Sequence, residues 1–253
     1  MASISDFHLP RSLLPRIGGM ATMPSRMESL RSALPHIVAQ VDHLFIYLDK
    51  YQAIPPELQA NPKITAMLPR PARSGETALG AAGKFLALEK FTSPCLFFGF
   101  DDDIRYGEGY VPHLATALRR YAYRCVVGLH GAIYQPAPTS YVNGRHVFNF
   151  SHANPFDVLV DELGTGTIAF HSSTLRVSHQ RWAEPNQCDL LLMIDAVRQQ
   201  IPRIALRRPA GVAQALFENQ DDSLYRASLV DDSLQTQLLN AAMQAYPGRW
   251  CRS

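Results

Sequence analysis

The stretch Cys95-Leu-Phe-Phe-Gly-Phe100, followed at once by Asp101-Asp102-Asp103-Ile104, decides the fold that we expect for this chain. An uninterrupted apolar run that ends in charge is typical of a strand buried on both faces of a sheet. Side chains alternate along an extended chain, so Asp101 and Asp103 should lie on one side and Asp102 on the other. The run therefore predicts a central strand with an acidic tip.

Three adjacent carboxylates at this tip repel one another, by about 1 kcal/mol per pair in water and by several times more beside an apolar wall. A hard divalent cation such as Mg²⁺ or Mn²⁺ removes that repulsion, because it prefers carboxylate oxygens as ligands. An acidic turn that merely ends the strand is the alternative interpretation. A buried strand in front of the triplet favours the metal site, with Asp101 and Asp103 as the ligands.

Length and composition place the chain among ordinary soluble globular proteins. Its 253 residues suffice for one sizeable α/β domain or two small ones. With 47% hydrophobic residues, 18% charged residues and a net charge of +2, the composition argues against a nucleic-acid-binding domain, which would be strongly basic. We find no apolar window that predicts a transmembrane helix and no pattern that predicts a signal peptide.

The four cysteines are far apart in the sequence and form no Cys-x-x-Cys pair. This spacing predicts reduced, packed thiols rather than disulfides or a zinc site, and it indicates a cytoplasmic protein. The residues are Cys95, Cys125, Cys188 and Cys251.

Apolar runs and segments of helical spacing alternate along the chain, which predicts an α/β fold with a layered, mostly parallel sheet and helices on both faces. The carboxyl ends of parallel strands gather at one sheet edge, where ligands bind. Thr22, Asp49 and Asp101 should lie at that edge. We expect strands at 16–22, 43–48, 63–68, 95–100, 124–130, 156–160, 166–170 and 203–206, and helices near 30–41, 77–91, 109–123, 189–199 and 233–245.

In combination, several short motifs resemble those of bacterial glycosyltransferases of the GT-A type, close to the family-2-like group with its Asp-x-Asp motif. The resemblance spans about residues 16–210 and implies a Rossmann-type layered sheet. It also implies a single catalytic domain over 1–253, with a nucleotide-sugar half at about 16–105, an acceptor half at about 106–210 and a C-terminal helical tail at about 211–253. The motifs are Thr22-Met-Pro-Ser-Arg26, Lys84-Phe85, Phe100-Asp-Asp-Asp-Ile104, Leu163-Gly-Thr-Gly-Thr-Ile-Ala-Phe-His171 and Cys188-Asp-Leu190.

The resemblance implies a nucleotide-diphosphate sugar as donor, with UDP as the expected nucleotide. Asp49 would accept a hydrogen bond from the base, unless it only caps a turn. Lys84 would contact diphosphate or ribose, unless it is a solvated helix lysine. Asp101 and Asp103 would hold Mn²⁺ or Mg²⁺ with the diphosphate, and Asp101 could also face the ribose. The remaining donor-binding residues would be Thr22, Pro24, Arg26 and Asp102.

Glycosyl transfer also needs a carboxylate that accepts the proton of the acceptor hydroxyl. The resemblance places this base at Asp189, at the start of a helix, and favours inversion of configuration. Asp189 could instead cap that helix, and Asp161-Glu162 is a rival pair of bases. The aromatic-rich segment 134–156, together with Trp182, is the expected acceptor groove.

The chain departs from many members of this group, because no histidine follows His179 to complete a metal site. Arg207 and Arg208 could take over part of that charge. The implied acceptor is a glycan or a lipid-linked glycan in bacterial surface polysaccharide synthesis. The implied location is the cytoplasm, including a peripheral position at the inner face of the membrane through the acceptor or partner proteins.

Other functions are compatible with parts of the sequence. A non-catalytic nucleotide-sugar-binding module for assembly would keep the same donor residues. A sugar nucleotidyltransferase would need a longer glycine-rich loop than Gly18-Gly19 with Arg26 provides. An aspartyl-phosphate phosphatase is rejected, because its acidic motif would lie near the N-terminus and Arg105 occupies the position of its Thr or Val.

Overall fold

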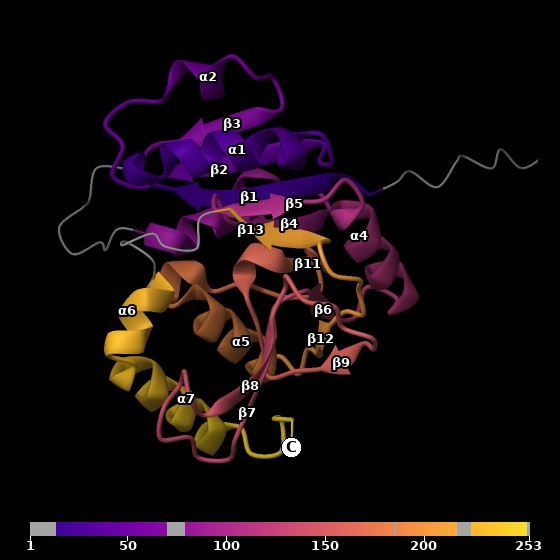
Figure 1. Ribbon diagram of the computed structural model, residues 1–253, viewed down its shortest axis with the longest axis vertical. Helices are drawn as coiled ribbons and strands as arrows, with labels where there is room; N and C mark the ends of the chain where they lie inside the picture. Colours follow the sequence, from indigo (N-terminus) through magenta and orange to yellow (C-terminus); the bar gives the residue numbers. More distant parts are fainter. Residues whose placement is uncertain (1–13, 70–78, 185, 217–223, 252–253) are drawn as a thin grey trace, which may run out of the picture.

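The computed structural model describes residues 14–69, 79–184, 186–216 and 224–251. Within them, eight strands form one mixed sheet in the order β3-β2-β1-β4-β11-β6-β12-β9, which runs from top to bottom in Figure 1. The strands are β1 (Arg16–Thr22), β2 (His43–Leu48), β3 (Ile64–Met67), β4 (Leu96–Phe100), β6 (Val126–Gly128), β9 (Val158–Leu159), β11 (Ile168–His171) and β12 (Arg203–Ala205).

The strand directions divide the sheet into two parts. Strands β3, β2, β1 and β4 are parallel to one another, and β6 is parallel to β12. Strand β11 runs antiparallel to both β4 and β6, and β9 runs antiparallel to β12. The α/β fold is therefore confirmed, with a sheet that is mixed rather than nearly all parallel. Because β11 is antiparallel to both of its neighbours, β4 and β6 point in the same direction. Strands β6 and β12 therefore point the same way as β1 and β4.

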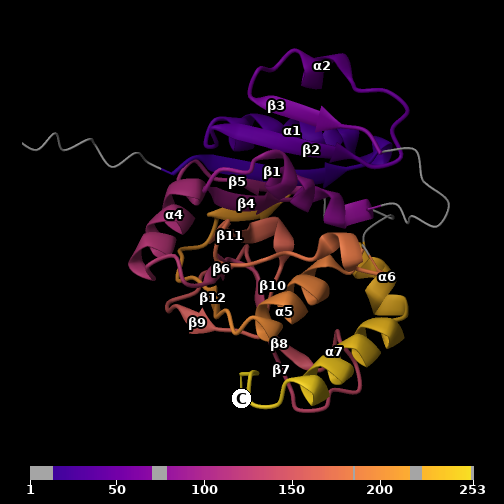
Figure 2. The same ribbon diagram turned by 180° about the vertical axis from the view of Figure 1, so that it is seen from behind.

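Helices cover both faces of the sheet, as expected (Figures 1 and 2). Alternation along β4 explains why, since Phe98 and Phe100 pack on one face and Phe97 on the other. Helices α1 (Met27–Val38) and α4 (Tyr110–Arg120) pack with Phe98 and Phe100, whereas the helical turn η2 (Gly80–Leu86), α3 (Ala87–Lys90) and α5 (Cys188–Arg198) pack with Phe97.

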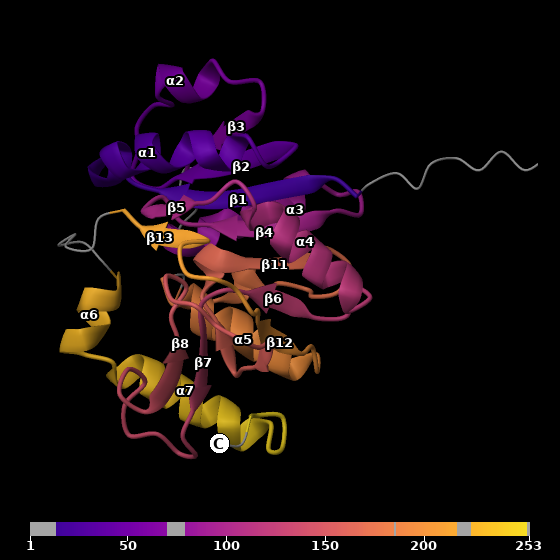
Figure 3. The ribbon, with the colours of Figure 1, turned by 45° about the vertical axis from the view of Figure 1, so that its right-hand side comes forward.

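Smaller elements complete the molecule around the second half of the sheet. A three-stranded sheet, β10-β7-β8, packs near α5 and α7, and the ribbon β13-β5 lies beside the end of β4 (Figure 3). None of the helices among the described residues has the length and apolar character needed to cross a membrane. The remaining elements are η1 (Pro24–Arg26), α2 (Pro56–Gln59), β5 (Ile104–Tyr106), β7 (Gly131–Tyr134), β8 (Arg145–Phe148), β10 (Glu162–Leu163), η3 (Thr165–Thr167), η4 (His179–Arg181), β13 (Ala213–Ala215), α6 (Leu224–Val230) and α7 (Ser233–Ala245).

One helix differs from its sequence prediction. We expected a single α-helix over 77–91, but the described part is the 3-10 turn η2 followed by the short helix α3, while Thr77 and Ala78 lie outside the described residues. Gly83 shows the reason, because a Cβ there would lie 2.1 Å from a ring carbon of Tyr47. The close approach of η2 to the sheet therefore takes precedence over regular helical geometry.

Candidate functional site

The candidate site lies at the carboxyl ends of β1 and β4. After β1 the chain continues to β2 and β3 on one side, and it returns to β4 on the other side of β1. Such a reversal of strand order is the position at which open α/β sheets bind ligands. Thr22, Asp49 and Asp101 fall at the expected edge, at or directly after the ends of β1, β2 and β4.

Lys84 is buried beside this edge and forms an ion pair with Asp101. Its side chain is 3% exposed, and Nζ lies 2.5 Å from Asp101 Oδ1. Burial opposes the charge on Lys84, but the Asp101 carboxylate more than compensates and raises the pKa of Lys84 above its ordinary value. Lys84 is therefore charged at neutral pH, and its interpretation as a solvated helix lysine is wrong.

Thr165 connects this ion pair to Asp189. Lys84 Nζ donates to Thr165 Oγ1 over 3.3 Å, and the Thr165 hydroxyl and backbone N–H donate to Asp189 Oδ1 over 2.6 Å and 2.8 Å. Gln187 occupies the N-cap position of helix α5, and its side chain makes no capping hydrogen bond. Asp189 lies within the first turn of the helix. The capping interpretation of Asp189 is thus wrong. Its Oδ2 accepts no hydrogen bond from any described residue, so this oxygen is available to a ligand.

The turn η3 brings Thr165 to Asp101 because Gly166 has no side chain. A Cβ at Gly166 would lie 1.9 Å from Asp101 Oδ2. The Tyr106 hydroxyl fixes the same junction, since it accepts from the Asp101 N–H over 2.8 Å and donates to the Gly166 carbonyl over 2.6 Å. The Tyr106 hydroxyl therefore holds the backbone at Asp101 and the backbone at Gly166 at a fixed separation.

The other two aspartates of the triplet have different surroundings. Asp103 is 35% exposed and accepts from Arg26 Nη1 over 3.0 Å, whereas Asp102 is buried and its Oδ2 lies 2.5 Å from Thr22 Oγ1. Burial raises the pKa of Asp102 to about 7, and burial followed by the charge of Asp101 raises the pKa of Asp103. The predicted alternation is confirmed. Asp102 and Thr22 bond each other instead of facing a ligand, which corrects their assignment as donor-binding residues.

Asp49 and Pro24 flank the first strand end. The Asp49 backbone N–H donates to the Thr22 carbonyl over 2.8 Å, while its buried carboxylate makes no hydrogen bond to a described residue. Burial raises the pKa of Asp49. Pro24 is exposed at the start of η1. The Asp49 carboxylate can thus accept a hydrogen bond from a ligand, as predicted for the base edge.

Sequence reasoning missed His130, which lies two residues after β6 at the same sheet edge. The charges of Asp189, Arg145, Arg208 and Asp101 all act on its imidazole, and burial lowers its pKa to about 4. Its Nδ1 is buried without a partner. The rule that selected Asp49 and Asp101 applies equally to His130, because His130 is the last residue of the strand expected at 124–130.

Arg208, which the sequence analysis considered together with Arg207 as a substitute for part of the metal charge, is a second cation near the site. The guanidinium is 5% exposed and donates to backbone carbonyls, including that of Leu206 over 2.9 Å. No carboxylate among the described residues pairs with it, and burial lowers its pKa to about 10. A buried cation with this environment favours an anionic ligand nearby.

The rival bases are enclosed. Asp161 is fully buried and accepts from the backbone N–H groups of Tyr134 and Cys251. Glu162 is 3% exposed, accepts from Tyr141 over 2.8 Å and from Arg145 over 3.2 Å, and burial raises its pKa to about 7. Both carboxylates are therefore buried and already hydrogen-bonded, whereas Asp189 is only partly buried.

Trp182 does not belong to an acceptor groove. Its ring packs edge-on against Phe85 at 5.5 Å between centroids, and its Nε1 donates to Asp195 over 3.3 Å. Phe150, from the segment 134–156, does contact the candidate site, with its ring 5.9 Å from that of His130. Phe150 is thus adjacent to the site, and Trp182 is part of the core.

Asp101 and Asp103 could bind a metal ion whose remaining ligands come from a bound diphosphate and water. No group of three or more His, Cys, Asp or Glu side chains that could hold a metal ion is found within the described residues. Mg²⁺ is commonly bound by one or two carboxylates, with substrate phosphates and water completing its shell. The donor set of Asp101 and Asp103 fits that kind of site and does not fit a closed site made of protein ligands alone.

Comparison with known proteins adds no family to this description. No protein-family model matches the chain, and a search of curated proteins finds no match. Function is therefore inferred from the geometry of the site and from the sequence resemblance.

Proposed function

We propose that the protein is a metal-dependent glycosyltransferase that moves a sugar from a nucleotide diphosphate, with UDP as the expected nucleotide. The observation that carries the proposal is the continuous contact from Asp101 through Lys84 and Thr165 to Asp189, at the point of strand-order reversal. One end offers carboxylate and ammonium groups for a metal-bound diphosphate. The other end offers a carboxylate oxygen for a proton.

The leaving group is a diphosphate whose negative charge grows as the glycosidic bond breaks. A bound Mn²⁺ or Mg²⁺ would act as a Lewis acid there, with Asp101 and Asp103 as its protein ligands. Lys84 and Arg26 are fixed on these same carboxylates, so their charges are held in place before the ligand arrives. Asp49 would accept the hydrogen bond from the base, and Pro24 would lie beside it.

The acceptor hydroxyl must lose a proton as it attacks the anomeric carbon. Asp189 Oδ2 is the proposed proton acceptor, because Thr165 holds Oδ1 with two hydrogen bonds and Oδ2 accepts none from the described residues. Attack from this side, opposite the diphosphate, gives inversion of configuration. The charges of Asp189, Asp101 and Arg208 act on the His130 imidazole, so we expect His130 and Arg208 to lie near the bound acceptor or diphosphate.

The sequence resemblance extends the proposal to a glycan or lipid-linked acceptor in bacterial surface polysaccharide synthesis. We place this reaction in the cytoplasm, including the inner face of the membrane. All four cysteines are free thiols, which supports a reducing compartment. Two alternatives keep the same donor site: a non-catalytic nucleotide-sugar-binding module and, with less support from the motifs, a sugar nucleotidyltransferase.

Thermal unfolding with UDP, in Mn²⁺ or in EDTA, tests the donor and metal together. We expect UDP to raise the unfolding temperature only with Mn²⁺, and we expect Asp101→Asn and Asp103→Asn to remove the effect. Glu28→Gln, an exposed substitution on α1, should behave like the wild type. Equal stabilisation by UDP in EDTA would contradict the metal role, and absence of any stabilisation by a nucleotide diphosphate would contradict the donor site.

Turnover of UDP-sugars then separates the alternatives. Release of UDP that depends on an added acceptor supports the transferase. Metal-dependent UDP binding with no turnover of any nucleotide sugar would favour the binding module. Formation of a nucleotide sugar from UTP and a sugar phosphate would favour the nucleotidyltransferase.

A further inference from the structure

A cavity of about 400 Å³ lies at the opposite end of the strands from the candidate site. It is lined by the end of α3, the segment that leads into β4, and the segment after β11. The five residues of β4 separate the two sites by about 17 Å, at about 3.3 Å per residue. This cavity is therefore distinct from the proposed donor and acceptor site, and its volume falls in the range that holds small organic ligands.

Two cations line this cavity without partners. The guanidinium groups of Arg176 and Arg181 make no hydrogen bond or ion pair with any of the residues that the structure describes, and both side chains are exposed. The carboxylate of Glu89, also in the lining, is already engaged, since it lies 2.8 Å from His179 Nε2 and accepts from Gln180 Nε2 over 2.6 Å. The cavity thus has unneutralised positive charge.

His179 supplies a second, independent observation. Its side chain is 5% exposed, and its Nδ1 is buried without a hydrogen-bond partner. The ring is held between Phe85 and Trp182, with centroid separations of 6.4 Å and 6.5 Å, and by its contact with Glu89. Burial lowers the pKa of His179, so the imidazole is neutral and one ring nitrogen is a hydrogen-bond acceptor.

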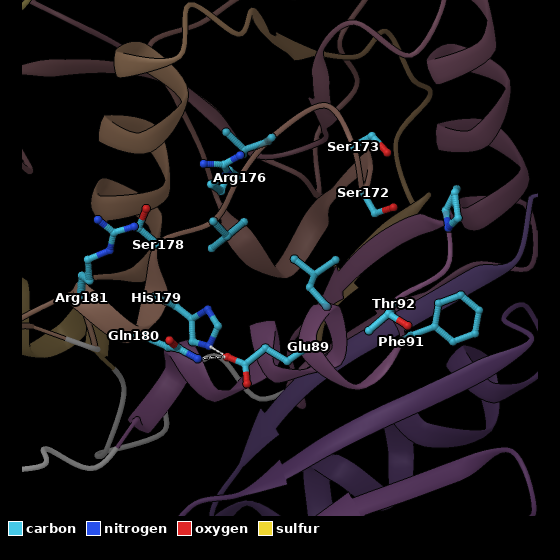
Figure 4. A pocket seen from close by; sticks show the side chains of 14 residues that line it. Glu89, Phe91, Thr92, Ser172, Ser173, Arg176, Ser178, His179, Gln180 and Arg181 are labelled. Carbon is cyan, nitrogen blue, oxygen red and sulfur yellow. Dashed lines mark hydrogen bonds and ion pairs between the residues drawn. The ribbon is translucent and has the colours of Figure 1, made fainter.

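Serine and threonine hydroxyls line the cavity together with the two arginines and His179. Figure 4 shows His179, Arg181, Ser178 and Arg176 toward one side and Ser172, Ser173 and Thr92 toward the other. Leu88, Leu175 and Val177 contribute apolar surface. Guanidinium groups bind phosphate through paired hydrogen bonds, and an imidazole acceptor requires a donor such as a ligand hydroxyl.

We propose that this cavity binds a small phosphorylated polyhydroxy compound, with the phosphate on Arg176 and Arg181 and a hydroxyl donating to His179. The neighbouring hydroxyls of serine and threonine bind the remaining polar groups of such a ligand. This second site does not depend on the proposed glycosyl transfer.

Calorimetric titration of the full chain with four probes tests the proposal. Glucose 6-phosphate carries both features, methyl phosphate has only the phosphate, glucose has only the hydroxyls, and gluconate replaces phosphate by carboxylate. We expect glucose 6-phosphate to bind with one-to-one stoichiometry, at least tenfold tighter than each of the other three. No binding of glucose 6-phosphate would overturn the proposal, and tighter binding of gluconate would overturn the assignment to phosphate.

Substitutions locate the binding site. The double substitution Arg176→Gln with Arg181→Gln should weaken binding of glucose 6-phosphate at least tenfold. The matched pair Arg119→Gln with Arg124→Gln, on exposed arginines elsewhere, should leave it within twofold. Unchanged affinity in the first pair would place the ligand elsewhere, including at the candidate transferase site, and would overturn the proposal.

His179→Phe tests the hydroxyl contact separately. Phenylalanine keeps the packing against Phe85 and Trp182 but removes the acceptor nitrogen. We expect glucose 6-phosphate to bind this variant no more tightly than methyl phosphate does. A preserved preference for glucose 6-phosphate in folded protein would contradict the role of His179, and the arginine pair decides the proposal if the variant does not fold.

Discussion

Lys84 Nζ lies 2.5 Å from Asp101 Oδ1, and the lysine side chain is almost fully buried. Lys84 belongs to η2, which covers the sheet, whereas Asp101 directly follows strand β4. A buried ammonium is costly unless a carboxylate and further hydrogen bonds compensate its charge. Asp101 and Thr165 together provide that compensation. Thr165 also donates two hydrogen bonds to Asp189, so stability and the proposed chemistry depend on one connected set of contacts.

Lys84→Met is the first test of this relationship. We expect a loss of about 1–3 kcal/mol in the free energy of unfolding, because Asp101 loses its partner but is 40% exposed and therefore partly screened by water. UDP-sugar turnover should fall by about 10²-fold, as for loss of one fixed charge donor. Urea unfolding and steady-state turnover measure the two effects.

Lys90→Met is the control for the Lys84 substitution. Lys90 is exposed at the end of α3 and pairs with no described residue, so its replacement should change neither quantity. Wild-type turnover in Lys84→Met would show that the buried ammonium is structural only.

Asp189→Asn tests the proposed base. Asparagine keeps a side-chain oxygen that can accept from Thr165, but it cannot take up the acceptor proton. We expect turnover to fall by about 10²–10⁴-fold, while the dissociation constant for UDP with Mn²⁺ stays within about twofold. Acceptor-dependent UDP release and calorimetric titration are the measurements.

Glu184→Gln is a matched control, because Glu184 is an exposed acidic side chain shortly before α5. It should leave both turnover and UDP binding unchanged. If Asp189→Asn turns over donor at the wild-type rate, another group accepts the proton and Asp189 has only a structural role.

Gly166→Ala tests the close approach of η3 to Asp101. The new Cβ would lie 1.9 Å from Asp101 Oδ2, and this partly exposed carboxylate can turn aside while the backbone stays in place. We expect UDP–Mn²⁺ affinity to fall by about tenfold or more, which corresponds to about 1.4 kcal/mol. Titration of the variant measures this loss.

Gly109→Ala is the control for the glycine substitution, since a Cβ at Gly109 meets no atom within 4 Å. Gly109→Ala should unfold at the same urea concentration as the wild type and bind UDP equally well. Gly166→Ala should unfold at a lower urea concentration, because a displaced Asp101 carboxylate leaves the buried Lys84 without its partner, and it should also bind UDP more weakly. Equal UDP affinity in both would contradict the role of the Gly166 contact in placing Asp101.

Local patterns in the sequence were sufficient for some parts of this molecule. Strand β1, strand β2 and helix α7 begin and end where the apolar runs and periodicity predict, and the alternation of the Asp triplet is confirmed. These features depend on neighbouring residues only, through the periods of strand and helix. They positioned Asp101 and Asp103 correctly at a sheet edge.

The remaining parts depend on contacts between distant residues. Lys84 and Thr165 are 81 residues apart, so no local pattern shows that the lysine is buried. His130 ends the strand expected at 124–130, but only the structure shows that Asp189, Arg208 and Asp101, all distant in the sequence, act on its imidazole. The role of Asp102 changed because its partner, Thr22, comes from β1, 80 residues earlier.

The buried Asp102 gives the protein a pH-dependent stability. Its pKa is raised to about 7 by burial, whereas the ordinary value of 3.8 applies when the chain unfolds. The folded state therefore binds this proton more tightly than the unfolded state does. The resulting stabilisation is complete below about pH 4 and is lost progressively as the pH rises through 7.

Asp102→Asn removes this titration while keeping a polar group beside Thr22. The free energy of unfolding, measured in urea from pH 4.5 to pH 8, should fall more steeply with pH in the wild type than in the variant. Glu162, whose pKa is also raised to about 7, contributes the same trend to both proteins and cancels in the comparison. Glu28→Gln should reproduce the wild-type slope, because Glu28 is exposed on α1. Parallel curves for wild type and Asp102→Asn would show that Asp102 does not hold its proton in the folded state.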